Sequence, residues 1–182
     1  MSRIPTPVTI EKSPVESQGL LNAVNAKLGS VPNMFRLIGN SPAALEAYLS
    51  FGGALEKSTV DLATRERIAL TVAQVNSCDY CLAAHSYIGA NVAKLSAEDI
   101  AASRAGSSPN AKAAAAVHFA HRVASNRGRV TEGDIAAVKA AGYSDGAVVE
   151  IIALVALNVL TNYINVALKT EVDFPEAETL TA

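Results

Sequence analysis

The sequence predicts an all-α fold, a single oligomeric bundle of about eight helices. No stretch alternates apolar and polar residues over the length of a strand between hairpin turns. Alanine, the residue with the highest helix propensity, is abundant along the chain. Residues that cap helices recur ahead of its apolar stretches. These observations favour helices throughout.

The N-terminal part of the chain contains an arm and two predicted helices. Prolines punctuate residues 1–14, so we expect this arm to be extended. Residues 15–28 form the first predicted helix, which the glycine and proline of residues 29–32 end. Ser41 is predicted to cap the second helix, residues 42–57, whose first residue is proline.

Two further predicted helices carry the residues of greatest chemical interest. Asp61 or Thr64 can cap the first of them, whose apolar positions continue to residues 76–77. Ser77 is predicted to cap the second, which extends to about Val92. The predicted helices that follow begin at residues of capping type, namely Ser96, Ser108 before Pro109, Thr131 and Ser144. They end near Asn126, Gly142 and Lys169 where an end can be assigned.

One domain accounts for residues 1–182. It consists of the N-terminal arm (1–14), a core of about residues 41–126 that holds both cysteines, and C-terminal helices (131–170) with a tail. Half of the residues are hydrophobic and only 18% are charged. Such apolar content in a small protein predicts additional buried surface, most simply a subunit interface.

Charge and hydropathy restrict the partners that we expect. A formal net charge of −2 gives no electrostatic footprint for a nucleic acid. Residues 1–7 lack the apolar segment of a signal peptide, and the most apolar run, residues 151–157, is too short to span a bilayer. We therefore expect a cytoplasmic protein that binds neither nucleic acid nor membrane.

The two cysteines of the chain form a C-x-x-C motif, Cys78 and Cys81, with His85 four residues after the second. On one helix these positions fall at i, i+3 and i+7 and share a face. Glu66 lies one predicted helix upstream. Two thiols, an imidazole and a carboxylate can therefore meet in one pocket. In a reducing compartment, such a motif is more typical of redox, catalytic or metal sites than of structural disulfides.

The residue types at this site suit peroxide reduction. The thiolate is the reactive form of cysteine, and the N-terminus of a helix favours it, most strongly at Cys78. His85 is the natural proton acceptor for Cys81, and Glu66 can orient the imidazole. One sulfur can attack an O–O bond, and the other can condense with the resulting sulfenic acid to form a disulfide.

Other interpretations remain open for these residues. The cysteines can pack as small hydrophobic side chains, or they can join His85 and Glu66 as zinc ligands. Structural zinc usually draws on two separated ligand pairs, so we expect no metal, and because the chain has no nucleotide fingerprint we expect no cofactor. His118 and His121 lack an apparent third ligand and are predicted to be structural.

A polar stripe interrupts the last predicted helix. Asn158, Asn162 and Asn165 lie at i, i+4 and i+7 among apolar residues. Buried amides need partners, so the stripe either lines the active pocket or pairs across a subunit interface, and we favour the interface. Asn162 and Tyr80 are nevertheless candidates for lining the pocket.

The pattern Glu-x11-Cys-x2-Cys-x3-His resembles the AhpD-like (alkylhydroperoxidase) branch of the carboxymuconolactone decarboxylase superfamily. Residues 32–35, 161–165 and 172–175 resemble the peroxidase-related subgroup of that branch, so the resemblance covers most of the chain. It implies an all-helical dimer, trimer or hexamer that reduces hydroperoxides with a thiol reductant. That reductant would be a lipoyl protein, a thioredoxin-like protein or a small thiol.

The resemblance also implies roles for the site residues. Cys81 would be the peroxidatic thiol and Cys78 the resolving thiol, with Glu66 and His85 as the proton relay. Peroxidases of the family usually have a histidine where this chain has Tyr80, and a phenol is a poor base at neutral pH. This departure keeps a non-enzymatic redox sensor or adaptor as an alternative. A decarboxylase-type lyase ranks last, because the decarboxylases lack the C-x-x-C pair.

Overall fold

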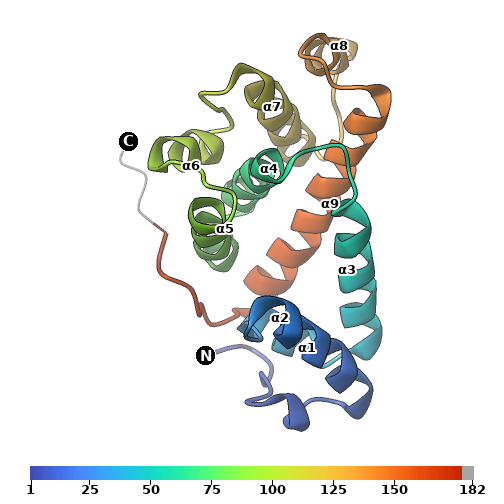
Figure 1. Ribbon diagram of the computed structural model, residues 1–182, viewed down its shortest axis with the longest axis vertical. Helices are drawn as coiled ribbons and strands as arrows, with labels where there is room; N and C mark the ends of the chain where they lie inside the picture. Colours follow the sequence, from blue (N-terminus) through green and yellow to red (C-terminus); the bar gives the residue numbers. More distant parts are fainter. Residues whose placement is uncertain (178–182) are drawn as a thin grey trace.

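The computed structural model describes residues 1–177, and within this range it contains α-helices, one short 3-10 helix and no strand (Figure 1). The all-α prediction is confirmed. The elements are η1 (Ile10–Lys12), α1 (Val15–Leu28), α2 (Asn33–Ile38), α3 (Pro42–Leu55), α4 (Leu62–Val75), α5 (Asp79–Asn91), α6 (Ala97–Arg104), α7 (Ala111–Ser125), α8 (Glu132–Ala140) and α9 (Asp145–Leu168).

Most of the predicted caps are present. Four predicted N-cap side chains accept a hydrogen bond from a backbone N–H in the first turn of the helix that follows, namely those of Ser41, Ser96, Thr131 and Ser144. Asp61, rather than Thr64, caps α4, since its Oδ1 accepts the backbone N–H of Thr64 at 2.9 Å.

Asn110, rather than Ser108, caps α7, with its Oδ1 2.9 Å from the backbone N of Ala113. The prediction for Ser108 was wrong because its hydroxyl accepts the backbone N–H of Asn110 in the preceding turn.

Helix α2 was missed by the sequence prediction, which placed no helix between residues 28 and 42. Pro32 precedes α2 and provides no side-chain cap. Instead, the backbone N–H of Asn33 donates to the carboxylate of Asp173 at 2.7 Å. Because the capping group comes from the C-terminal part of the chain, no capping residue next to α2 in the sequence indicates where this helix begins.

Helix α4 is the central element, and it contacts α5, α6, α7 and α9 (Figure 1). Residues 67–73 of α4 are all buried. Even its polar Thr71 is enclosed, and the hydroxyl donates to the carbonyl of Ser103 at 2.6 Å, which links α4 to α6. Because this middle part of α4 is buried on all sides, residues 68–73 form a run that is apolar except for Thr71, rather than an apolar stripe on one face.

Two apolar clusters form the core. The first joins α4, α7 and α9 and includes Ile68, Phe119 and Ile151. The second lies where α1, α2 and α3 meet α5, and it contains both cysteines together with Leu21 and Leu45 from α1 and α3. The C-x-x-C motif is therefore part of the hydrophobic core and not of a surface loop.

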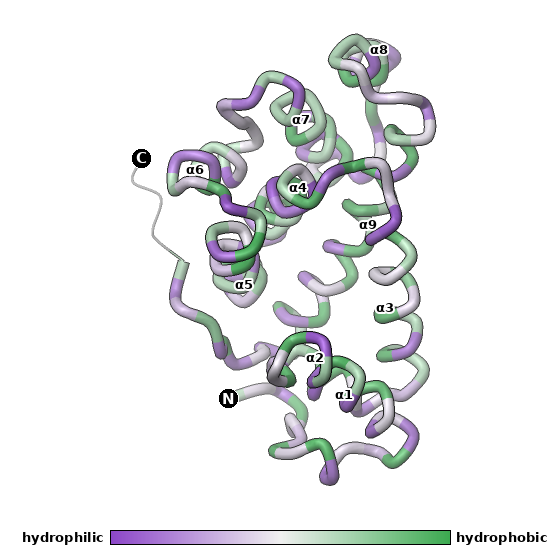
Figure 2. Tube along the Cα trace, in the orientation of Figure 1, coloured by the Kyte–Doolittle hydropathy of each residue, from purple (hydrophilic) through white to green (hydrophobic). Residues whose placement is uncertain are grey.

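By length and composition alone, helix α9 could cross a membrane. The sequence prediction had excluded a membrane-spanning segment because it considered only the apolar run of residues 151–157. Apolar segments recur along this helix (Figure 2). One face of α9 contacts α3, α4, α5 and α7, as expected of a core helix in a packed domain. Core helices of packed domains also meet these criteria of length and hydropathy. Val149, Ile152, Leu160 and Tyr163 of α9 are exposed, and the subunit interface stays a prediction.

An ion pair between α4 and α6 generates a prediction about pH and stability. The Nη2 of Arg67 lies 2.8 Å from Oδ1 of Asp99, and both side chains are largely buried. Hydrogen bonding by Arg67 holds the pKa of Asp99 below its usual range, against the effect of burial. Because the pKa is lowered in the folded protein, the pair stabilises above the unfolded-state pKa, and this stability is lost as the pH falls through the folded value.

We expect Asp99→Asn to lower the free energy of unfolding at pH 7 by about 1–3 kcal/mol. Between pH 7 and about pH 3 the variant should lose less stability than the parent protein. Urea denaturation at the two pH values measures both effects. Asp145→Asn, at an exposed carboxylate that pairs with Lys139, is the control. An unchanged pH dependence in Asp99→Asn would contradict this account.

Candidate active site

The turn between α4 and α5 places the C-x-x-C motif at the start of a helix. Ser77 has a left-handed backbone (φ 52°) and does not cap α5, so the predicted role of Ser77 was wrong. Cys78 is the N-cap, and its sulfur accepts the backbone N–H of Cys81 at 3.3 Å. The N-terminus of a helix stabilises the thiolate form of a cysteine in this position.

The two sulfurs are joined in a disulfide, with the Cα atoms of Cys78 and Cys81 5.3 Å apart. Both residues are buried, with exposed fractions of 1% and 3%. Of the two, Cys81 lines a cavity and Cys78 lies behind it. A substrate in this cavity therefore meets Cys81 first.

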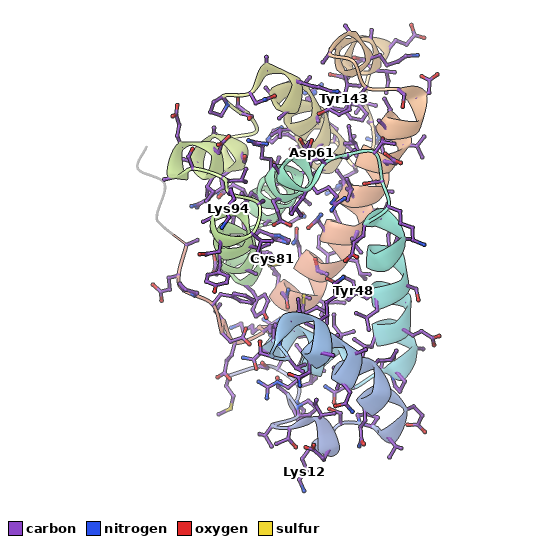
Figure 3. All side chains as sticks on the ribbon, in the orientation of Figure 1. Lys12, Tyr48, Asp61, Cys81, Lys94 and Tyr143 are labelled. Carbon is purple, nitrogen blue, oxygen red and sulfur yellow. A yellow bond between two sulfur atoms is a disulfide. The ribbon has the colours of Figure 1, made fainter. Side chains whose placement is uncertain are left out.

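The cavity has a volume of about 380 Å³ and lies between α1, α2, α3, α4, α5 and α9. Cys81 on α5 and Tyr48 on α3 come from two of its walls (Figure 3). Most of the wall is apolar, including Val24, Leu28, Met34, Phe35, Leu49, Leu154, Leu157 and Phe174. Volume and lining are typical of a site for a small organic molecule.

Glu66 and His85 form a hydrogen-bonded pair in the wall beside Cys81. The Nδ1 of His85 lies 2.8 Å from Oε2 of Glu66, and both side chains are mostly buried. Because Nδ1 is held by the carboxylate, Nε2 is the ring nitrogen left for chemistry in the cavity. The structure thus brings together the four predicted site residues, Cys78, Cys81, His85 and Glu66, from α4 and α5.

Tyr48 belongs to the same cavity and was missed by the sequence analysis. Its ring packs against Phe35, with the ring centroids 5.7 Å apart. Burial, with a smaller effect of the Glu66 carboxylate, raises the pKa of Tyr48 to about 12. The phenol is therefore protonated at neutral pH and can donate a hydrogen bond. Its signal in the sequence was the inward stripe of Leu45, Tyr48 and Leu49 on α3.

Tyr80 lines the cavity, but its hydroxyl is engaged elsewhere. It donates to Oδ1 of Asp173 at 2.8 Å and accepts the backbone N–H of Met34 at 3.2 Å. Its ring meets Phe174 edge to face at 5.8 Å. Burial is the main cause that raises the pKa of Tyr80 above its ordinary value. Tyr80 thus ties α5 to α2 and to the C-terminal tail, which passes beside α5 (Figure 1).

The asparagine stripe on α9 faces the interior of the subunit. The preference for a subunit interface was wrong, because all three side chains are buried within the chain and have partners there. Asn158 and Asn165 line the cavity, and Nδ2 of Asn165 donates to Sγ of Cys81 at 3.3 Å. Asn162, the predicted pocket residue, lies outside the cavity wall and accepts a hydrogen bond from Asn76 at 2.9 Å.

His118 and His121 lie together on α7, away from the cavity wall. Within the described residues, no group of three His, Cys, Asp or Glu side chains is arranged to hold a metal ion. The two histidines therefore have no role in the site described here.

The contacts of Tyr80 lead to a stability prediction. We expect Tyr80→Phe to lower the free energy of unfolding by about 1–3 kcal/mol, because Met34 N–H and the Asp173 carboxylate lose their partner. Urea denaturation of the oxidised protein measures the loss. Tyr163→Phe, at a side chain 61% exposed, is the matched control and should change stability by less than about 0.5 kcal/mol. Equal stabilities for the two variants would contradict the assigned role.

Comparison with known proteins places this site in a family context. The model of the carboxymuconolactone decarboxylase family matches residues 42–125, which include all four predicted catalytic residues. No curated protein matches the sequence. The matched segment extends from α3 through α7 and thus covers the central helix and the C-x-x-C helix.

Several solved structures share the fold over almost the whole chain. The alkylhydroperoxidase AhpD core of an uncharacterized peroxidase-related protein from Ralstonia eutropha JMP134 is 26% identical, covering 94% of this chain and 92% of that one, with a TM-score of 0.83. An uncharacterized peroxidase-related protein from Silicibacter sp. TM1040 is 22% identical, with coverages of 93% and 91% and a TM-score of 0.78. The debrominase Bmp8, in complex with 2,3,4-tribromopyrrole, is 19% identical, with coverages of 95% and 94% and a TM-score of 0.79.

The two structures of lower identity show the common fold alone. The family match over the cysteine-containing core and the 26% identical structure over nearly the full length agree with each other. Together these findings support a resemblance of the chain to the superfamily that comprises AhpD-like proteins and carboxymuconolactone decarboxylases.

Proposed function

We propose that the protein is a thiol-dependent peroxidase that reduces hydroperoxides through a Cys78–Cys81 dithiol/disulfide cycle. The observation that carries the proposal is the position of Cys81, which faces an organic-sized cavity beside the Glu66–His85 pair. Cys78 lies within bonding distance behind it. A nucleophile, a base and a resolving thiol are thereby collected at one place.

The first half-reaction begins with the reduced protein. His85 takes the proton of the Cys81 thiol, and Glu66 stabilises the resulting imidazolium. The Cys81 thiolate attacks the terminal oxygen of the hydroperoxide, the S–O bond forms and the O–O bond breaks. The alkoxide that leaves takes the proton from His85 and departs as an alcohol. Sulfur is oxidised by two electrons, and the peroxide is reduced by two.

The second half-reaction restores the disulfide seen in the structure. The Cys78 thiol gives up its proton, and its sulfur attacks the sulfur of the Cys81 sulfenic acid. The S–S bond forms, the S–O bond breaks, and the departing hydroxide takes up that proton and leaves as water. A thiol reductant of the cell, a lipoyl protein, a thioredoxin-like protein or a small thiol, then reduces this bond to two thiols. The mainly apolar wall of the cavity supports an organic hydroperoxide over hydrogen peroxide as substrate.

The setting that we propose follows from the sequence and from the exposed face of α9. We infer a cytoplasmic protein, since reduction of the disulfide needs a reducing compartment. We infer a homo-oligomer of two, three or six subunits, and the exposed apolar side chains Val149, Ile152, Leu160 and Tyr163 support such an assembly.

A redox sensor is the second candidate, and Tyr80 favours it. Its hydroxyl connects the C-x-x-C helix to Asp173 in the tail, so reduction of the disulfide can be transmitted to the surface of the protein. This candidate predicts slow peroxide turnover and a change of assembly on oxidation. Identical elution of the two redox forms in size-exclusion chromatography would reject it. A decarboxylase-type lyase ranks last, although the debrominase relative illustrates that this fold serves more than one reaction.

We expect reduced protein to lose both thiols on mixing with about one equivalent of cumene hydroperoxide, with formation of the Cys78–Cys81 disulfide. Cys81→Ser should abolish the peroxide-dependent loss, because the remaining Cys78 thiol lies outside the cavity wall. Titration of free thiols and mass spectrometry measure the two results. Thiol consumption that is unchanged in Cys81→Ser would show that Cys81 is not the nucleophile.

The proton relay makes a separate prediction. We expect His85→Gln to slow the first thiol-oxidation step by roughly 100-fold, since general acid–base catalysis contributes on the order of 10²–10⁴ in rate. Stopped-flow measurements with cumene hydroperoxide follow this step. His118→Gln, on α7 and away from the cavity wall, is the matched control and should react at the parent rate. Equal rates for the two variants would exclude His85 from the relay.

A further inference from the structure

Asn165 is the side chain of α9 that contacts the active sulfur. Its Nδ2 donates to Sγ of Cys81 at 3.3 Å, and the residue is 3% exposed. The same side chain lines the cavity. Asn165 is therefore in a position to act on both the sulfur and a molecule in the cavity.

The sulfur needs a donor of this kind. Cys81 is 3% exposed and lies in an apolar cluster with Leu21, Met34 and Leu45, and burial among apolar groups disfavours a thiolate. The backbone N–H of Cys81 itself is taken by the sulfur of Cys78. The amide of Asn165 is neutral at all relevant pH values, so it can donate to the thiolate whatever the charge of His85.

The other end of the Asn165 amide lacks a partner. Its Oδ1 is buried without a hydrogen bond to any described residue. An unpaired buried acceptor is unfavourable, and beside a cavity it is suited to a ligand that donates a hydrogen bond. The terminal O–H of a hydroperoxide is such a donor, and its oxygen is the atom that the thiolate attacks.

We propose that Asn165 is a catalytic residue of the peroxidase reaction, an inference that rests on the proposed function. Its N–H group stabilises the Cys81 thiolate, and its carbonyl oxygen accepts the terminal O–H of the hydroperoxide. Asn165 thereby holds the attacking sulfur and the attacked oxygen side by side. The amide neither gains nor loses a proton, and the alkoxide still takes its proton from His85.

The thiol pKa of Cys81 tests the first half of this proposal without any peroxide. A substitution of Asn165 leaves unchanged the titratable groups that line the cavity or adjoin the sulfur. These are Lys27 of α1, Tyr48 of α3, Glu56 after α3, Arg65 and Glu66 of α4, Cys78 at the N-cap of α5, and Tyr80 and His85 of α5. The rate of alkylation of reduced protein by iodoacetamide, followed against pH and assigned to Cys81 by mass spectrometry, gives the pKa.

We expect Asn165→Leu, which is close to Asn in size, to raise the pKa of Cys81 by about one unit. Asn165→Asp should raise it further, because the carboxylate repels the thiolate. Asn158→Leu is the matched control, since Asn158 lines the cavity but donates to the carbonyl of Leu154, and it should leave this pKa unchanged. Circular dichroism establishes that each variant is folded. An unchanged Cys81 pKa in folded Asn165→Leu and Asn165→Asp would overturn the proposal.

The reaction with cumene hydroperoxide tests the second half. At a pH where Cys81 is fully ionised in both proteins, Asn165→Leu should still react about ten-fold more slowly than the parent, because the acceptor for the O–H is missing. Equal rates at that pH would overturn the substrate-holding role. If the parent protein itself does not react, the proposed function fails, while the alkylation measurement still decides whether Asn165 stabilises the thiolate.

Discussion

Cys81 lies in the apolar interior, where a charged sulfur is unfavourable, so the surrounding helices must supply the groups that a thiolate needs. Helix α4 contributes Glu66, α5 contributes His85, and α9 contributes Asn165, whose amide contacts the sulfur. Each of these groups is itself held by burial or by a hydrogen bond. The chemistry of the site therefore depends on the relative placement of three helices rather than on any one loop.

The placement of those helices follows from α4. Because α4 is enclosed by α5, α6, α7 and α9, a shift of this helix would disturb contacts on all sides. The ion pair of Arg67 with Asp99 and the hydroxyl of Thr71 fix α4 to α6, while Glu66 on the same helix reaches His85. The C-terminal tail adds a further tie, since Asp173 receives the hydroxyl of Tyr80 and the first N–H of α2. The C-x-x-C helix is thus anchored at its start from two sides.

Features of this fold that depend on residues close together in the chain could be predicted from the sequence. Features that depend on contacts between distant residues could not. A capping side chain binds a backbone N–H within one turn, so the starts of four helices could be predicted from their caps, Ser41, Ser96, Thr131 and Ser144. Helix α2 was not predicted because the carboxylate that accepts its first backbone N–H belongs to Asp173, which is distant in the sequence.

The same distinction holds for the site. The spacing of Cys78, Cys81 and His85 follows from helix periodicity. The spacing of the asparagines allowed either the pocket or an interface, and only the packing of α9 places Asn165 at the cavity, as the packing of α3 does for Tyr48. The buried asparagines need no subunit interface, since their partners lie within the chain.

The central claim is that Cys81 attacks the peroxide and Cys78 resolves the product. Its most direct test is to trap the intermediate in Cys78→Ser with dimedone after one addition of cumene hydroperoxide. A single dimedone adduct located on Cys81 by mass spectrometry is the predicted result. Absence of any adduct, with the Cys81 thiol intact, would contradict the account.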